Sequence, residues 1–188
     1  IAHGLVGSEM CIRDRLGQDI DGTARIDRSG EAISFSSDGS ILAIGAKSPG
    51  RVRIYELKSN NFWSQLGSDI NGEQSGDESG FSVSLSSDGL RVAIGSPGWQ
   101  VVGTGNDRGQ VRIFDYNGSA WVQVGADIDG EAAGDFCGSG VSLSSDGSIL
   151  AVGASSNDGG GTNSGHVRIY KYTPSGVSSW TQLGADID

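Results

Sequence analysis

One segment repeats three times along this sequence, and its opening returns a fourth time near the end. Each copy runs from a Leu-Gly-x-Asp-Ile motif, in which Val124 replaces Leu in the third copy, through Ser-Ser-Asp-Gly and a Val-Arg-Ile run to a Trp. Ser-Ser-Asp-Gly begins at residues 36, 86 and 144, and the Trp residues are Trp63, Trp121 and Trp180. A period of roughly 50–60 residues is typical of propellers and related arrays, in which one unit is too thin to bury its own core.

The middle copy has the pattern of four strands joined by turns. Apolar and polar residues alternate with a period of two, as in a half-buried strand. Asp88-Gly89 and Asn117-Gly118 are strong signals for tight hairpin turns. The four expected strands cover residues 81–86, 90–96, 110–116 and 120–128.

Four antiparallel strands in chain order form the blade of a β-propeller. We therefore expect an all-β, β-propeller fold of about three four-stranded antiparallel blades, with approximate limits of 30–78, 80–128 and 138–188. Closed propellers have about four to eight blades, so three blades form an incomplete ring. Such a ring exposes unpaired strand edges, and we expect further blades or self-association to close it.

The charge and the hydrophobic content of the sequence limit the classes of partner that the protein can bind. Thirteen basic residues against 23 acidic ones give a formal net charge of −10. This charge argues against nucleic acid and anionic membranes, because both require clustered Lys and Arg, but it permits a cation or a basic protein surface. No stretch approaches the roughly 20 apolar residues of a transmembrane helix, so no membrane span is expected.

The first residues do not belong to the repeat. Residues 5–15 read LVGSEMCIRDR and resemble the in-frame translation of a common sequencing adapter. Residues 1–15 are therefore expected to be non-native, and residues 16–188 to be the β-propeller repeats. Because the repeat is interrupted at Leu16 and Asp188, we expect the natural protein to extend beyond both. Cys137 is then the one remaining cysteine, which excludes an internal disulfide.

The string SGFSVSLSSDGLRVAIGSP (79–97) resembles the FG-GAP repeat of integrin-alpha-type β-propellers. The resemblance implies a non-enzymatic binding or adhesion module at the cell surface or outside the cell. The calcium loop of many such repeats is missing, since only Ser-Ser-Asp-Gly remains where several oxygen ligands are needed. Residues 33–57 also look like a Trp-Asp-repeat blade without its Gly-His and Trp-Asp signatures. The alternative function is therefore an intracellular scaffold propeller for protein–protein interaction.

Acidic residues concentrate in the loops after the fourth strand and between the second and third strands, which open on the same side of a propeller. The candidates for a ligand-binding loop face are Asp69, Glu73, Asp77, Trp99, Asp107, Asp127, Glu131, Asp135 and Asp158. One hypothesis is that this rim binds a protein, a carbohydrate or a cation such as calcium. The other is that these carboxylates cap turns and keep the surface soluble.

Signals for catalysis are poor, so the sequence predicts no catalytic residue, no cofactor and no enzyme. No phosphate loop, dinucleotide motif or Cys/His metal spacing is present. His166 is expected at an exposed strand start, and Cys137 as a tolerated small residue. The repeated arginines are expected to brace neighbouring blades through carboxylate partners, and the three repeated Trp residues to anchor the outer strands. These arginines are Arg53, Arg112 and Arg168.

Overall fold

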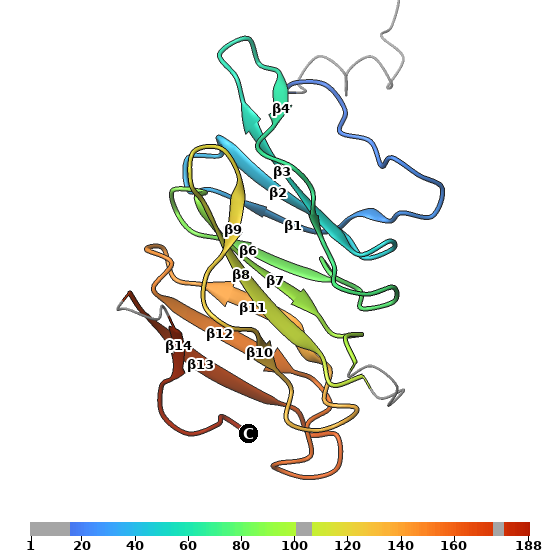
Figure 1. Cartoon of the computed structure of the whole chain (residues 1–188), viewed down its shortest axis with the longest axis vertical. Coiled ribbons are helices and arrows are strands. Elements are labelled where there is room, and N and C mark those ends of the chain that lie inside the picture. Colours follow the sequence, from blue (N-terminus) through green and yellow to red (C-terminus); the bar gives the residue numbers. More distant parts are fainter. Residues whose placement is uncertain (1–15, 101–106, 175–178) are drawn as a thin grey trace, which may run out of the picture.

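The computed structural model describes residues 16–100, 107–174 and 179–188, so the prediction for residues 1–15 lies outside the described part. These residues form three antiparallel sheets, here called blades 1, 2 and 3, stacked one on another (Figure 1). Blade 1 contains β1 (Ser29–Phe35), β2 (Ile41–Ala46), β3 (Arg51–Leu57), β4 (Trp63–Gln65) and β5 (Ile70–Asn71). Blade 2 contains β6 (Ser82–Leu85), β7 (Arg91–Ser96), β8 (Gln110–Tyr116), β9 (Trp121–Gln123) and β10 (Ile128–Asp129). Blade 3 contains β11 (Cys137–Leu143), β12 (Ile149–Ala154), β13 (His166–Thr173) and β14 (Ser179–Gln182).

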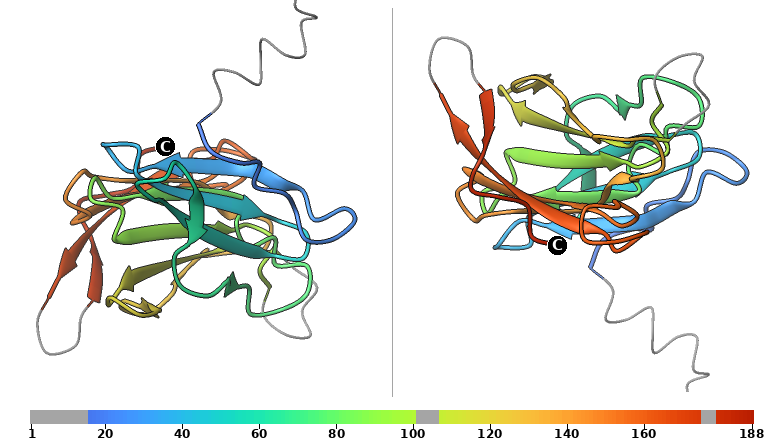
Figure 2. Two further views of the ribbon diagram at one scale, coloured as in Figure 1. Left: turned by 90° about the horizontal axis from the view of Figure 1, so that it is seen from above. Right: turned by 90° about the horizontal axis from the view of Figure 1, so that it is seen from below.

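The strands of each blade pair in chain order, which confirms the predicted meander. Seen along the stack, the three sheets overlap (Figure 2). The described residues contain no helix, and therefore none that is long and apolar enough to cross a membrane. The fold is thus an all-β, β-propeller type with an unclosed set of blades.

The predicted fourth strand is not continuous. In blade 2, residues 120–128 divide into β9 and β10, and both pair with β8. The interruption lies at Gly125, whose φ of 82° is in the left-handed region that favours glycine. The equivalent Gly67 and Gly184 have φ of 77° and 82°. The glycine of this motif therefore forms a kink that recurs in the outer strand of each unit.

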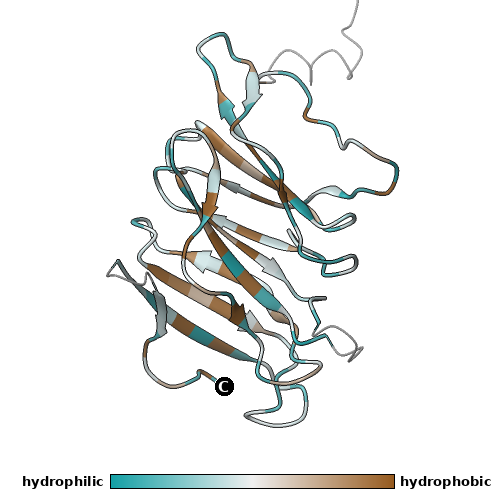
Figure 3. Cartoon of the chain, viewed as in Figure 1, coloured by the Kyte–Doolittle hydropathy of each residue, from teal (hydrophilic) through white to brown (hydrophobic). Residues whose placement is uncertain are grey.

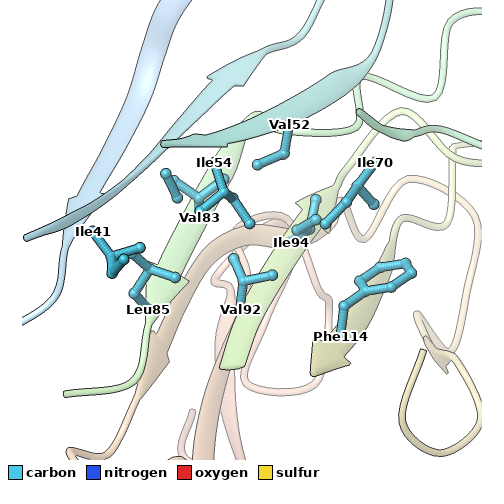
Figure 4. Close-up of a cluster of buried hydrophobic side chains, with 10 residues drawn as sticks. Ile41, Val52, Ile54, Ile70, Val83, Leu85, Val92, Ile94 and Phe114 are labelled. Atoms are coloured by element: carbon cyan, nitrogen blue, oxygen red, sulfur yellow. The ribbon is translucent and has the colours of Figure 1, made fainter. Parts of the chain in front are cut away.

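The hydrophobic core lies between the blades. Hydrophobic residues are concentrated in the strands of the stacked sheets (Figure 3). Between blades 1 and 2, Ile54 lies opposite Val83 and Ile94, and each of these residues is buried (Figure 4). A second core between blades 2 and 3 includes Ile113 and Leu150. A single sheet has no such core, so each blade is stabilised by its neighbours.

Backbones of adjacent blades approach one another at paired glycines. A Cβ built on Gly45 would lie 2.0 Å from the carbonyl oxygen of Gly80. At the next interface, a Cβ on Gly95 would lie 2.1 Å from the carbonyl oxygen of Gly138. No real side chain tolerates such distances, so glycine is required at Gly45 and Gly95 for close stacking.

Hydrogen bonds repeat across both interfaces. The N–H of Leu85 donates to Ser34 Oγ, and the N–H of Leu143 donates to Ser84 Oγ, each at 2.9 Å. At the hairpin turns, the Ser37 N–H donates to the Ser87 carbonyl at 2.9 Å. The Ser87 N–H in turn donates to the Ser145 carbonyl at 2.8 Å. The Ser-Ser-Asp-Gly motif therefore links turns as well as forming them.

The repeated Trp residues join successive units at the outer strands. Trp121 Nε1 donates to the Leu66 carbonyl at 2.8 Å, and Trp180 Nε1 donates to the Val124 carbonyl at 3.2 Å. The indole of Trp121 lies against Gly67, where a Cβ would be 2.9 Å from Trp121 Cδ1. Gly17 and Gly67 thus make room for Trp63 and Trp121, the Trp residues of the units that follow them. This confirms the Trp residues as packing anchors.

We expect Trp121→Phe to lower the free energy of unfolding by about 1 kcal/mol, because it keeps the ring but removes one part-buried hydrogen bond. Chemical denaturation monitored by circular dichroism measures the change. Trp99→Phe is the matched control, since Trp99 Nε1 donates only to the exposed Glu73 at 3.2 Å. Equal effects of the two substitutions would contradict the role given to the Trp121 indole.

Candidate functional site

Two sets of loops lie at one end of the blades (right side of Figure 1). One set connects each blade to the next, and the other joins the second strand of a blade to the third. The members of these sets that belong to blade 1 and to its connection with blade 2 line a hollow of about 750 Å³, which is the candidate functional site. The hollow is bordered by three segments, namely 26–28, 47–50 and 71–78.

Buried carboxylates hold the inter-blade loops. The side chain of Asp77 accepts backbone N–H groups of Glu73 at 2.8 Å and Ser79 at 3.0 Å. Asp77 is 1% exposed, and the equivalent Asp27 and Asp135 are 3% exposed. Asp77 and Asp135 were candidates for ligand contact, but the structure turns both carboxylates into their own loops. Removal from solvent makes them loop anchors and withdraws them from a ligand.

A polar cluster recurs where each loop meets the third strand. In blade 2, Gln110 Nε2 donates to Asp127 Oδ2 at 3.0 Å, and Gln123 Nε2 donates to Asp127 Oδ1 at 2.5 Å. Gln110 Nε2 also reaches Glu73 Oε2 at 3.4 Å. In blade 1, Arg51 takes the place of Gln110 and donates to Asp69 at 3.4 Å. Asp69 and Asp127 are therefore occupied by donors of their own blade.

In blade 3 the same cluster contains Glu131, His166, Arg168 and Asp186. His166 is buried, so the prediction of an exposed strand start is wrong, and its Nδ1 lies 3.4 Å from Asp186 Oδ2. Among the described residues, Glu131, His166 and Asp186 are close enough together to hold a metal ion. However, Arg168 pairs with Glu131 and with Asp186, the latter at 2.9 Å, and so already supplies the positive charge. The Arg168 guanidinium accordingly lowers the pKa of Asp186.

The repeated arginines do brace the blades, and two of them donate to backbone carbonyls of the preceding unit. Arg53 donates to the Asp21 carbonyl and Arg112 to the Asn71 carbonyl, each at 2.9 Å. The predicted carboxylate partners are found for two of the three: Arg112 lies 3.8 Å from Glu73, and Arg168 lies 2.9 Å from Asp186. In both of the carbonyl contacts, the acceptor is the residue that follows an Asp-Ile pair of the preceding unit.

Ile26 is the most unusual residue at the hollow. It is 68% exposed and has a φ of 66°, which is a true outlier for a β-branched side chain. The other two units place Gly76 and Gly134 here, with φ of 88° and 89°. Sequence reasoning missed Ile26, although a β-branched residue in a column of glycines is a signal that could have been found. Strained and exposed apolar residues of this kind concentrate at binding sites.

The remaining candidates are spread along the same end. Glu73 lines the hollow, while Trp99 and Asp107 are half-buried beside the loop of blade 2. Asp158 is exposed and accepts the Asn163 N–H at 2.7 Å. The structure therefore brings Glu73 and Trp99 together but leaves Asp158 in the separate loop of blade 3.

Cys137 does not have the environment of a nucleophile. It is 5% exposed, and burial raises the pKa of its thiol to about 12. A reactive cysteine needs a stabilised thiolate, so this side chain is part of the core between blades 2 and 3.

The hairpin aspartates provide a pH prediction. The Ser144 hydroxyl, together with the backbone and hydroxyl of Ser148, lowers the pKa of Asp146 from 3.8 to about 2. Because the pKa of Asp146 is lower in the folded protein than in the unfolded chain, its ionised carboxylate stabilises the fold at pH values above 3.8. This contribution is lost as the pH falls through about 2. We expect Ser144→Ala to raise the Asp146 pKa in an NMR titration, while Asp38, held near 2 by its own serines, stays unchanged. An unshifted Asp146 would contradict the assigned cause.

No protein-family model matches this sequence, and no curated protein matches it. Solved structures do match it. A candidate 6-phosphogluconolactonase from Bacteroides uniformis has a TM-score of 0.57 and 16% identity, over 83% of this chain and 40% of that chain. The β-propeller domain of Cps50 (Swd1) from Myceliophteria thermophila has a TM-score of 0.53 and 17% identity, over 87% and 41%. KlAtg21, in complex with the coiled-coil of AgAtg16, has a TM-score of 0.54 and 13% identity, over 83% and 41%.

These similarities show that the chain has a β-propeller fold. The chain spans about two fifths of the length of the structures that it matches. The finer resemblance to the FG-GAP family stays a prediction, since no family model supports it.

The prediction that the chain is not an enzyme has to be corrected. A structure described as a candidate 6-phosphogluconolactonase shares this fold, so the fold does not exclude catalysis. The prediction relied on the lack of acid–base residues that recur in every blade. That reasoning was faulty because a reaction needs one set of groups, assembled once, and not a repeated set.

Proposed function

We propose that this chain is part of a β-propeller that binds a protein partner at the loop end, with Ile26 as the apolar anchor. The exposed side chain of Ile26, held in a left-handed backbone where equivalent units have glycine, carries this proposal. Burial against a partner would remove an apolar side chain from water, which offsets the backbone strain.

The lining of the hollow indicates the chemistry of the partner. Lys47 is already engaged, with Nζ 3.6 Å from Glu78 and 4.9 Å from the centre of the Phe81 ring. Glu73 and Glu78 keep 41% and 40% of their side chains exposed. A partner segment that presents an apolar side chain beside a basic one fits this arrangement, and the net charge of −10 favours its approach.

One of the similar structures supports a protein as the ligand. KlAtg21 was solved with a coiled-coil bound. Both an adhesion propeller of the FG-GAP kind and an intracellular scaffold would use such a contact, so a protein partner is common to the two readings. The location of the protein outside the cell or at the cell surface stays a separate prediction.

Panning a random peptide library displayed on phage tests the proposal. We expect selected peptides to combine apolar and basic residues, and to bind the Ile26→Gly variant at least tenfold more weakly in calorimetry. This variant does not threaten the fold, since glycine suits a φ of 66°. Leu90→Ala is the matched control, because Leu90 is an exposed apolar residue at a hairpin turn. Unchanged binding to Ile26→Gly would overturn the proposal.

A further inference from the structure

The stack has two internal interfaces, between blades 1 and 2 and between blades 2 and 3. Its two outer surfaces carry the equivalents of the residues that form these interfaces. We call the surface of a blade that faces the next blade its trailing face, and the surface that faces the previous blade its leading face. In the described structure, the trailing face of blade 3 and the leading face of blade 1 lie at opposite ends of the stack (Figures 1 and 2).

The trailing face of blade 3 exposes residues that are buried in the other blades. Val52 and Val111 are 0% exposed, whereas the equivalent Val167 is 37% exposed. Ile70 is 6% exposed, but the equivalent Ile187 is 59% exposed. A shallow groove of about 290 Å³, bordered by Ala151, Gly153 and Val167, runs over this face.

The leading face of blade 1 is exposed in the same way. Ile33 is 62% exposed, whereas its equivalent Val83 in blade 2 is 9% exposed. Phe35 is 51% exposed, against 7% for Leu85. Both ends of the stack therefore present the apolar residues that form a core wherever two blades meet.

The equivalents of the paired glycines also occur at the ends of the stack, one at each end. Gly153 is the equivalent of Gly45 and Gly95, but a Cβ built on it would meet its nearest neighbour at an ordinary 3.6 Å. Gly30 is the equivalent of Gly80 and Gly138, and a Cβ on it would meet nothing within 4 Å. Each end thus keeps a glycine where no close backbone approach occurs.

Each hydrogen bond that repeats at the internal interfaces has the equivalent of one partner at each end of the stack. By equivalence with the internal interfaces, the trailing face of blade 3 offers the Ser145 N–H and the Ser142 hydroxyl. The leading face of blade 1 offers the Ser37 carbonyl and the Phe35 N–H. Donor and acceptor therefore face each other correctly if the two ends meet in the internal register.

We propose that the trailing face of blade 3 docks on the leading face of blade 1 of a second copy of this chain. The contact continues the internal blade–blade interface in polarity, register and residue type. It is head-to-tail, so it joins unlike surfaces and closes only if the rotation permits. Two copies bring six blades, which lies within the about four to eight blades of closed propellers.

Residues 16–21 occupy part of this docking surface. Trp63 Nε1 donates to the Leu16 carbonyl at 3.2 Å, where a docked partner would place its Leu183 carbonyl. Gln18 fixes the segment through two bonds to the backbone of Trp63, at 2.7 and 3.0 Å. The other units have Ser68, Ala126 or Ala185 at the position of Gln18. Docking must displace this segment, so Gln18 opposes the association.

Two half-blocked variants test the proposal. Gly153→Val fills the trailing face of blade 3, and Ile33→Glu charges the leading face of blade 1; the internal interfaces stay intact in both. We expect the full chain to associate in sedimentation velocity as its concentration rises, and each variant alone to associate at least tenfold more weakly. An equimolar mixture should form a one-to-one heterodimer, because each variant keeps the half that the other lacks. Heterodimer formation also proves that both variants are folded.

Gln18→Ala provides an independent arm, and we expect it to strengthen association of the full chain by releasing residues 16–21. A closed dimer or a head-to-tail series of larger species would each support the docking. A full chain that stays monomeric at about 100 μM would overturn the proposal and favour a further repeat of a longer polypeptide as the occupant. Half-blocked variants that associate as strongly as the full chain, or fail to form a heterodimer, would overturn it as well.

Discussion

Gly95→Ala is expected to lower the free energy of unfolding by about 3 kcal/mol, because the added methyl group forces apart two backbones that the fold holds in contact. The new Cβ would lie 2.1 Å from the Gly138 carbonyl oxygen and 2.2 Å from Ser82 Oγ. The serine can rotate away, but the carbonyl belongs to the backbone of blade 3. Relief therefore requires the two blades to separate. Thermal melting and chemical denaturation both measure the loss.

Gly153→Ala is the matched control for that substitution. It makes the same chemical change at the equivalent position of blade 3, where the nearest atom is 3.6 Å from the new Cβ. Replacement of a strand glycine by alanine without a clash is expected to change stability by less than about 1 kcal/mol. If Gly95→Ala and Gly153→Ala have equal effects on a monomeric sample, the close approach of blades 2 and 3 is not what requires glycine.

Asp77→Ala is expected to lower the free energy of unfolding by about 3 kcal/mol, because it removes the acceptor of one buried and two part-buried backbone N–H groups. Asp77 accepts the N–H groups of Glu73, Gln74 and Ser79, and is 1% exposed. Gly72 leaves room for this carboxylate, since a Cβ there would lie 2.2 Å from Asp77 Oδ2. The loss would spread to the interface, because this loop connects blade 1 to blade 2. Denaturant titration followed by circular dichroism measures it.

Asp158→Ala is the control for Asp77→Ala. Asp158 also caps a loop N–H, that of Asn163, but it is exposed to solvent that can replace the bond. We expect a cost below about 1 kcal/mol. A small effect for Asp77→Ala would instead leave Asp77 free to act at the loop end, as the sequence prediction placed it.

The sequence predicted the blades well because a strand in a blade is a local pattern. The alternation in residues 90–96 and the Asp88-Gly89 turn need no distant partner to be recognised. The interrupted outer strand was predictable in principle, since a glycine such as Gly125 within a strand signals a kink. The acceptor of Trp121 was not, because Leu66 lies 55 residues away and its carbonyl accepts the indole N–H only after the blades stack.

The candidate site was harder to predict because residue type does not reveal burial. Asp77 and Glu73 are both loop carboxylates in sequence, yet one is enclosed by its own loop and the other lines the hollow. His166 followed Gln110 and Arg51 in the alignment of repeats, and tolerance of different polar residues suggested exposure. In the structure all three lie beside the aspartate of the kinked strand: Arg51 and Gln110 donate hydrogen bonds to it, and His166 Nδ1 lies 3.4 Å from it.

The indole of each repeated Trp belongs to the boundary between two units and not to the unit that supplies it. Trp63, Trp121 and Trp180 each donate to a carbonyl of the preceding unit. Their fluorescence therefore reports on separate boundaries within one polypeptide. Variants that retain only one of these three Trp residues would provide a fluorescence probe of a single boundary. They would show whether the blades unfold one after another from one end or all together.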